Sequence, residues 1–557
     1  MRSAHLYART GPRAALPDAE SAIWPSVAIA LLLIAQAVMV HTRAINWDEF
    51  WYYSQIIGFK DGRLGLPLQT FHARAFAWLT LLDGNGVEQI VVARMVMLAL
   101  ELATLVAIFL LARRFADLAP SLMATLAYVS FSYVFQNGFS FRADPFATCL
   151  LMWSLVVLTR APINPTSLLL ASTLVGLAGI FTIKSILFLP AFAGMAWMRW
   201  READQSPRMA LLLVGFAIMS AVCFALLYAF HRTGMPLAPA SAGHGARLSA
   251  NAAQYMFFVG KPPNAGMALK GLLLSPGTTV AILAAPLLIW HSSMQSEEKL
   301  ALAGMGSIIL TLLFYRNTAS YYFVFMLAPV SVSLAPVMTA VLKKVRPSVA
   351  TAALSASTIF LFAISNHAVL ARQSAVEEGV RRLFPTPVAY FDHANTLPDF
   401  DKRNLLLMPW AMQAYRDAGV PHYRQEMERR PIPLVLENWW VLSDVLRATD
   451  ETQFLPADVA ALQSNYIEWQ WPVWVAGRQI APGANGQQEF LVPGEYRLIG
   501  GELAVDGKSF TQGDTITLTR GYHRIVNPGR NAVKLIWADI VGRPRELPPR
   551  GPLWVPL

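Results

Sequence analysis

Cysteine is scarce in this chain, and its scarcity narrows the kinds of site that the sequence can encode. Only two cysteines occur in 557 residues, Cys149 and Cys223, and both fall inside long apolar stretches. The last third of the chain has none, which excludes a disulfide framework and a cysteine-based zinc site there. That region also lacks a Ser-His-Asp order, a metal-spaced histidine cluster and a glycine loop of the kind that cradles phosphate.

Charge is also scarce. Asp, Glu, Lys and Arg make up 14% of the residues, whereas 55% are hydrophobic. So apolar a composition excludes an ordinary soluble enzyme. The formal net charge is +10, and in a chain of this kind it indicates basic cytoplasmic loops and contact with the phosphates of membrane lipids, not with nucleic acid.

Apolar stretches of about 18 to 24 residues dominate the first two thirds, and this is the length that a helix needs to cross a bilayer. We expect a multi-span α-helical membrane protein with about eleven spans. They cover residues 22–41, 89–112, 118–136, 144–159, 166–183, 185–199, 209–230, 273–290, 299–315, 320–342 and 348–368. The short pair around Lys184 could form one re-entrant unit. A transmembrane domain, residues 22–370, therefore follows a cytoplasmic tail, residues 1–21, and precedes a soluble region.

The basic residues orient these spans. With a cytoplasmic N-terminus, the inner connections carry Arg113, Arg114, Arg160, Arg199 and Lys343, as the positive-inside rule requires. An odd number of spans then places residues 371–557 outside. We expect a multi-pass protein of the bacterial inner membrane whose C-terminal region is periplasmic, with a long external loop at residues 42–88.

The external loop opens with two adjacent acids, Asp48 and Glu49, in the stretch NWDEFWYY. Three cations, Arg142, Lys184 and Arg316, are predicted at the same face, where the positive-inside rule disfavours them. Such a set suits the transfer of a sugar from a polyprenyl phosphate to a hydroxyl. A carboxylate takes the proton of the hydroxyl, and cations neutralise the departing phosphate. A divalent metal ion held by one acid could share the second task.

Each of these residues also has a plainer interpretation. Acids after a first span are often solvated, and cations near span ends often reach lipid headgroups. Arg142 and Asp144, in FRADPF, could simply pair at a helix start. Glu101 lies mid-span, as a functional carboxylate or as a hydrogen-bonding partner within the bundle. His72, in TFHARAF, is either a ligand or a loop residue.

Four stretches together resemble the GT-C superfamily of polyprenyl-phosphate-sugar glycosyltransferases, close to the protein mannosyltransferase and lipid A aminoarabinose transferase branch. They are NWDEFWYYSQI, FRADPFATCLLMWSLVVL, GLAGIFTIKSILFLPAFAGMAW and YRNTASYYFVFMLAPVSVSLAP, and they cover most of residues 22–342. The aminoarabinose transferases have a Lys-Pro-Pro stretch in the first external loop, which is absent from PLQTFHARAFAW here. This departure concerns the sugar and the acceptor and leaves the reaction class unchanged.

The resemblance implies roles for individual residues. Asp48 would be the catalytic base, and Glu49 would bind a metal or orient the acceptor. Lys184 and Arg316 would meet the donor phosphate, with Arg142 as a further phosphate-binding candidate. The other candidates for the cavity are His72, Asp144, Tyr321 and Tyr322. The resemblance also implies that the loop at 42–88 forms amphipathic helices lying on the membrane.

The soluble region shows two patterns. Residues 371–486 show α/β punctuation: RNLLLMP and PIPLVLENWW predict strands, and AMQAYRDAG predicts a helix ending at Gly419. Residues 487–557 contain short alternating runs with a hairpin signal at Asp506-Gly507, typical of a small β-sandwich. The neighbouring Trp439 and Trp440 could stack on sugar rings or pack in a core.

The sequence thus predicts an inverting membrane glycosyltransferase with Asp48 as base. Its partners would be a lipid-linked sugar donor, a glycan, lipid or protein acceptor, and membrane lipids. One alternative is a transporter or flippase of a lipid-linked sugar, although no inverted repeat is evident. Another is a structural scaffold for envelope assembly, which would tolerate neutral residues at positions 48 and 49.

Overall fold

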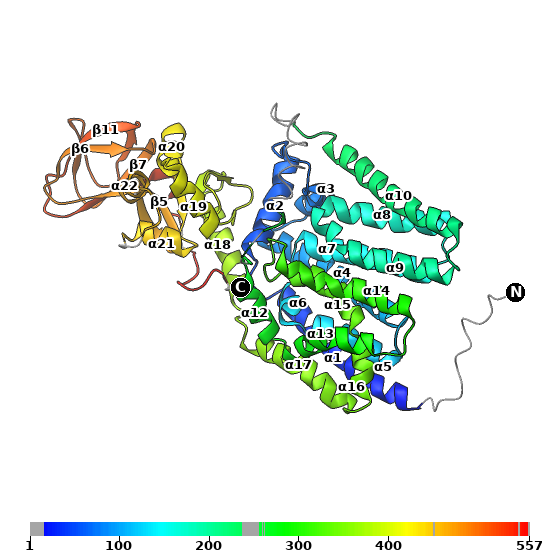
Figure 1. Cartoon of the computed structure of the whole chain (residues 1–557). Coiled ribbons are helices and arrows are strands. Elements are labelled where there is room, and N and C mark those ends of the chain that lie inside the picture. The colour runs from blue at the N-terminus through cyan, green and yellow to red at the C-terminus, as the bar shows by residue number, and fades with distance from the viewer. Residues whose placement is uncertain are drawn as a thin grey trace.

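The structure is a computed structural model that describes residues 16–236, 256–258, 260, 262–448, 452–543 and 546–554. It has two parts (Figure 1): a bundle of long helices and, at one end of the bundle, a domain of helices and strands that follows α18 (Val369–Leu383). Most of the expected cytoplasmic tail, residues 1–15, and the centre of the connection after α10, residues 237–255, lie outside the described residues.

The bundle is built from apolar helices. They are α1 (Leu16–Val40), α4 (Gly86–Ala112), α5 (Leu118–Val129), α6 (Ser132–Asn137), α7 (Ala143–Arg160), α8 (Pro165–Phe181), α9 (Leu189–Glu202), α10 (Pro207–Arg232), α12 (Ala265–Leu273), α13 (Pro276–Trp290), α14 (Ser296–Gly306), α15 (Tyr322–Ser333), α16 (Ala335–Leu342) and α17 (Pro347–Ile364), with the 3-10 helices η2 (Ile183–Phe188) and η4 (Ser307–Leu313). One large cluster of buried apolar side chains joins α1, α4, α5, α7 and α13 to α17.

Within the described ranges, five helical segments are long and apolar enough to cross a bilayer: Glu20–Val40, Gly86–Ala112, Ala143–Arg160, Pro207–Arg232 and Pro347–Leu383. Two bent pairs, α12 with α13 at 103° and α15 with α16 at 55°, raise the number to seven if each pair is one span. The expected multi-span helical architecture is therefore present. The expected count of about eleven spans is not confirmed, because several predicted spans are short or broken helices.

The expected break around Lys184 is one of these. Thr182 ends α8 in extended backbone (φ −157°, ψ 129°), and α9 starts with proline in its first turn. Between them, η2 carries Lys184 in a tight 3-10 turn. The pair 166–183 and 185–199 thus forms two helices that meet at this turn.

The first external loop contains α2 (Trp47–Lys60), α3 (Phe71–Ala75) and the 3-10 helix η1 (Ala77–Leu81). α2 begins with a capping box: the Asn46 side chain accepts from the backbone N–H of Asp48 at 2.9 Å, and Glu49 accepts from the N–H of Asn46, also at 2.9 Å. This box fixes the first turn of α2 and therefore the place of the acid pair.

The C-terminal domain combines helices with two sheets. Its helices after α18 are α19 (Pro409–Ala418), α20 (His422–Arg429), α21 (Trp440–Leu446), α22 (Pro456–Asn465) and η5 (Ala538–Ile540). Its strands are β1 (Ala389–Phe391), β2 (Asp401–Lys402), β3 (Leu434–Leu436), β4 (Tyr466–Gln470), β5 (Val473–Ile480), β6 (Asn485–Phe490), β7 (Gly494–Ile499), β8 (Leu503–Val505), β9 (Lys508–Phe510), β10 (Thr515–Leu518), β11 (Gly521–Val526) and β12 (Val533–Trp537).

The larger sheet has eight strands in the order β10-β7-β12-β5-β3-β1-β2, with β4 paired to β5. β1 runs parallel to β2 and β3, and the other pairs are antiparallel. A second sheet has the order β6-β11-β8-β9. Buried side chains of both sheets, including Leu503 and Leu535, belong to one core cluster, which gives the sandwich-like arrangement that the alternating runs predict.

Several local predictions can be compared with this domain. The helix ending at Gly419 is confirmed: Gly419 caps α19 in the left-handed region at φ 64°. The hairpin is confirmed as well, because Asp506 and Gly507, at φ 49° and 82°, join β8 to β9. The strand predicted at RNLLLMP is wrong, since residues 403–408 are not a strand and Leu405 is exposed. The sheet also crosses the predicted division at 486/487, because β12 pairs with β5.

Candidate active site

Glu49 is the anchor of the site. Its side chain is fully buried, and its carboxylate accepts from Arg94 Nε at 2.8 Å and from Arg94 Nη2 at 2.6 Å. It also accepts from the backbone N–H groups of Phe141, at 2.8 Å, and Asn46. Burial alone would raise the pKa of Glu49, but the Arg94 guanidinium and these hydrogen bonds hold it below its usual value. The carboxylate is therefore ionised.

Arg94 joins this anchor to the end of the first span. Its Nη1 and Nη2 donate to the backbone carbonyls of Arg43 and Ala44, each at 2.8 Å. One buried ion pair thus connects α4 to the start of α2, and the Phe141 contact adds the turn before α7. Three stretches that are far apart in sequence are held together next to Asp48.

Four charged side chains form a row beside this anchor. Arg142 pairs with Asp48, and its Nε lies 3.8 Å from Asp144 Oδ2. Asp144 pairs in turn with Lys184 Nζ. The signs alternate, so two carboxylates and two cations balance one another. The Asp48 side chain is 25% exposed, whereas the side chains of the other three residues are 8% exposed or less, so the row ends in one accessible carboxylate.

Helix starts position two members of the row. Arg142 occupies the N-cap of α7 and Asp144 its first turn, where the helix dipole stabilises a carboxylate. Asp48 lies in the first turn of α2. Arg142 and Asp144 do not pair only with each other, because Arg142 also pairs with Asp48 and Asp144 also pairs with Lys184.

Tyrosines cover the cations. The guanidinium carbon of Arg142 lies 3.3 Å from the ring centre of Tyr321 and 6.0 Å from that of Tyr52. Lys184 Nζ lies 5.8 Å from the ring of Tyr321 and 5.9 Å from that of Tyr322. These are cation–π distances. The expected cavity residues Tyr321 and Tyr322 therefore do meet the expected phosphate-binding residues Arg142 and Lys184.

The other residues that the sequence singles out are His72, Arg316 and Glu101. His72 is buried with its ring centre 4.4 Å from that of Tyr52, and burial lowers the pKa of His72 to about 3, so the ring is neutral. Arg316 is exposed, and its backbone N–H donates to Met256 O at 2.8 Å. Glu101 accepts from Gln36 Nε2 at 3.0 Å within the bundle, as the hydrogen-bonding alternative predicts.

The donor set does not suit a metal ion. Among the residues that the structure describes, no group of three or more His, Cys, Asp or Glu side chains could hold one. The Glu49 carboxylate already accepts four hydrogen bonds, and Asp48 and Asp144 are both paired with cations. In this structure the Glu49 carboxylate is enclosed by protein donors. That Glu49 binds a metal or orients the acceptor stays a prediction.

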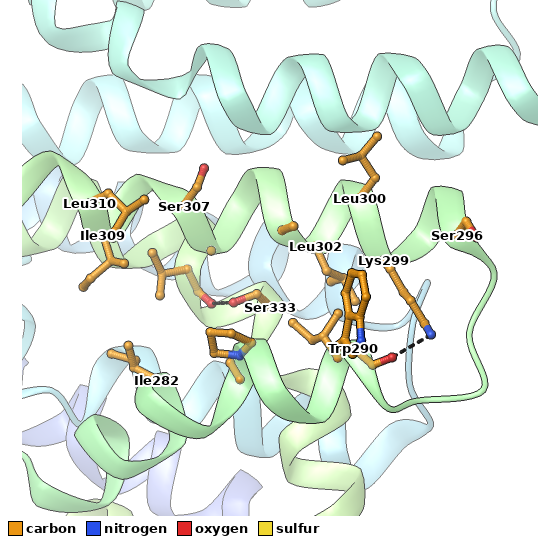
Figure 2. Close-up of a pocket in the computed structure, with 16 residues that line it drawn as sticks. Ile282, Trp290, Ser296, Lys299, Leu300, Leu302, Ser307, Ile309, Leu310 and Ser333 are labelled. Carbon is orange, nitrogen blue, oxygen red and sulfur yellow. Dashed lines mark hydrogen bonds between the residues drawn. The ribbon is translucent and has the colours of Figure 1, made fainter.

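A long apolar groove lies beside the site. It has a volume of about 670 Å³ and is lined by α13, α14, η4 and α15 (Figure 2). One end carries Trp290 and Lys299, whose Nζ donates to the Trp290 carbonyl at 2.9 Å. The other end includes Leu310. The next residue, Thr311, accepts a hydrogen bond from Tyr322 at 2.7 Å, so the groove ends close to the tyrosines that cover Lys184.

The sequence analysis did not predict the buried pair of Glu49 and Arg94. The only sign of Arg94 in the sequence is a single charge near the start of the span predicted at 89–112. Tyr52 lies within the acidic motif, but its position in the sequence alone does not identify it as a residue of the site. The spacing of Asn46 and Glu49 is that of a capping box, and this spacing could have identified Glu49 as a structural residue.

Comparison with known proteins bears on the fold. No protein-family model matches the chain, and no curated protein matches it in sequence. Among solved structures, ArnT from Cupriavidus metallidurans bound to undecaprenyl phosphate superposes with a TM-score of 0.54 at 12% identity, covering 83% of this chain and 98% of that one. The apo state of the same ArnT gives a TM-score of 0.52 at 13% identity, covering 82% and 98%.

The chain has a GT-C fold. The resemblance inferred from the four stretches is therefore confirmed at the level of the fold. The oligosaccharyltransferase of Archaeoglobus fulgidus in the apo form is also similar, with a TM-score of 0.46 at 11% identity over 92% of this chain and 96% of that one.

Proposed function

We propose that this GT-C protein is a membrane glycosyltransferase that moves a sugar from a polyprenyl-phosphate donor to an acceptor hydroxyl at the outer face of the bacterial inner membrane. The observation that carries the proposal is the charged row, in which one accessible carboxylate, Asp48, stands at the end of a set of buried cations. The fold adds support, because ArnT of the same fold was solved with undecaprenyl phosphate bound.

In the proposed reaction the acceptor hydroxyl binds at Asp48 and the donor phosphate near Lys184, with the sugar between them. The acceptor oxygen attacks the anomeric carbon while the bond from that carbon to the phosphate oxygen breaks. Asp48 takes the hydroxyl proton. Polyprenyl phosphate leaves, and Lys184 and Arg142 stabilise its charge. A single displacement of this kind inverts the anomeric configuration.

The apolar groove fits the lipid part of such a donor. Most of the residues that line it are apolar, and it leads toward the tyrosines around Lys184. A polyprenyl chain lying in the groove would place its phosphate at the charged row. Binding energy from the remote chain would then orient the reacting carbon.

The proposed orientation agrees with the charges at the other end of the bundle. Arg114, from a predicted inner connection, binds Glu298 at 3.3 Å and also binds Glu202. These three connections therefore meet at one face, together with the basic residues expected inside. In this orientation the C-terminal domain lies in the periplasm, and residues 22–370 form the catalytic membrane domain.

The decisive experiment uses the full chain reconstituted in vesicles with a labelled polyprenyl-phosphate sugar and a membrane extract as the source of acceptors. We expect a new labelled glycoside and release of polyprenyl phosphate. Donor that crosses the bilayer chemically unchanged, with no glycoside formed, would instead identify a flippase. A cell-envelope phenotype rescued by a variant neutral at both Asp48 and Glu49 would favour the scaffold.

A further inference from the structure

A second pocket, in the C-terminal domain, has an unusual lining. It has a volume of about 430 Å³ and is lined by four tryptophans, Trp439, Trp440, Trp471 and Trp554, and by Arg550 among other residues. This volume lies within the range of about 300 to 1,000 Å³ that is usual for ligand sites. Trp440 is 48% exposed, so a large aromatic surface is open to solvent.

The pocket lies where α/β sheets commonly bind ligands. Strands β1 and β3 are parallel, and the residues that follow them meet at one edge: the Asn438 side chain accepts from the backbone N–H of His393 at 2.9 Å. The His393 ring stacks on Trp439 at 4.3 Å between ring centres, with an interplanar angle of 6°. Ligands of open α/β sheets bind outside the carboxyl ends of their strands, which is the position of this pocket.

Two residues that line the pocket, Trp439 and Trp554, pack against the membrane domain. Trp47, the first residue of α2, makes edge contacts with Trp439 at 5.9 Å and with Trp554 at 6.4 Å. Trp554 also contacts Phe50 at 5.7 Å. Asp48 follows Trp47 directly in the chain. The aromatic contact of the pocket with the membrane domain is thus made by the residue that directly precedes the proposed base in the chain.

The polar groups of the pocket favour a neutral ligand. Glu437 is buried and accepts from Arg447 Nε and from Trp474 Nε1, each at 2.7 Å, while Arg550 lies 3.3 Å away. Arg447 also binds Glu468 at 3.1 Å. Two guanidinium groups and two carboxylates therefore balance. Arg550 is more than half exposed and can offer N–H groups to a ligand without requiring a negative charge.

We propose that this pocket binds the carbohydrate of the acceptor, so that the acceptor is a glycan. The C–H faces of sugar rings stack on flat indoles such as Trp440 and Trp471, while hydroxyl groups accept from Arg550. The inference deepens the proposed function, on which it rests. It places the acceptor glycan in the C-terminal domain, beside the tryptophans that contact Trp47 of α2.

The test measures binding of the full chain in detergent micelles to an array of bacterial envelope oligosaccharides. The wild type should bind a subset of them. Trp440→Ala should weaken that binding by about tenfold, and Trp440→Phe, which keeps a ring, should restore most of it. The matched control is Trp410→Ala, because Trp410 is 69% exposed on α19 in the same domain and is not part of the pocket lining.

Two results would overturn the glycan site: a wild type that binds none of the oligosaccharides, or a Trp440→Ala variant that binds them as the wild type does. A peptide array probed in parallel identifies a protein-binding pocket if binding to peptides is what Trp440→Ala removes, and this too overturns the proposal. If the wild type forms no glycoside but its glycan binding depends on Trp440, the proposed function fails and the site stands. If transfer depends on Asp48 but binding does not depend on Trp440, the site fails alone.

Discussion

The backbone N–H of Phe141 donates to Glu49 Oε1 at 2.8 Å. This contact holds the turn that carries Arg142 against the helix that carries Asp48. The two neighbouring acids of the motif therefore have different roles. Glu49 faces inward and fixes the geometry, whereas Asp48 faces the accessible end of the charged row.

Asp48→Asn should lower transfer by about 10²- to 10⁴-fold, the usual contribution of a general base. The amide keeps the shape of the side chain and can still accept a hydrogen bond from Arg142, so thermal stability should change little. Turnover of a labelled donor measures the effect. Asp61→Asn, an exposed acid of the same loop that pairs with Arg63, is the control. Near-normal turnover of the Asp48 variant would remove Asp48 from the mechanism.

Glu49→Gln should destabilise the protein much more than Asp48→Asn does. It leaves the fully buried Arg94 without its counter-charge, and removing one partner of a buried pair costs about 3 to 5 kcal/mol. Thermal unfolding of the purified variants compares the two. The double variant Glu49→Gln with Arg94→Met should recover part of the loss, and a double variant less stable than Glu49→Gln alone would contradict this account.

Lys184→Ala should raise the KM for the donor by about tenfold or more, because a hydrogen bond to a charged group contributes about 1.5 to 3 kcal/mol. Lys184→Arg should retain part of the donor affinity. Steady-state kinetics at several donor concentrations provide the measurement, with Lys60→Ala on α2 as an exposed control. If donor KM is unchanged while kcat falls, the phosphate binds elsewhere.

Ala303→Trp should partly fill the apolar groove, because Ala303 is exposed and lines it. We expect weaker use of a long-chain polyprenyl donor and unchanged use of a short-chain donor whose tail does not reach that depth. The control is Leu287→Trp, an exposed residue of α13 that does not line the groove. Equal effects on the two donors would show that the chain lies outside this groove.

Acidification should lower the free energy of unfolding of the protein. Burial lowers the pKa of His393 to about 3, whereas an unfolded histidine takes up its proton near pH 6.5. Below about pH 6.5 the unfolded state therefore binds more protons than the folded state, and stability falls until the pH approaches 3. At pH 5 the expected loss in the free energy of unfolding is about 2 kcal/mol.

His393→Phe should reduce this pH dependence because the aromatic packing remains while the proton-binding site is removed. Melting temperatures of the two proteins at pH 7.5 and pH 5.0 test it, with the exposed His291→Phe as control. A loss of stability on acidification that is identical in the wild type and in His393→Phe would assign the effect to other groups.

The sequence predicted the parts of this structure that depend on composition and spacing. Apolar windows located the helices, and paired acids with misplaced cations pointed to Asp48, Arg142 and Lys184, which the structure brings together with Asp144. Turn chemistry gave the hairpin at Asp506-Gly507 and the helix end at Gly419.

What the sequence could not predict depends on contacts between distant residues. The inward turn of Glu49 requires Arg94 and Phe141, both of which lie in other helices or turns. The number of spans depends on bends such as the one at 103° between α12 and α13, which hydropathy does not record. The predicted boundary between residues 486 and 487 does not separate two sheets, because β12 pairs with β5 across it. Strand pairing is a long-range property that local patterns do not record.

The charged row takes its members from positions 48, 142, 144 and 184, and its covering tyrosines come later, at 321 and 322. Segments that lie far apart in the sequence must therefore all be inserted and packed together before the row is complete. The row is a product of the assembled bundle, and no single helix or loop carries it.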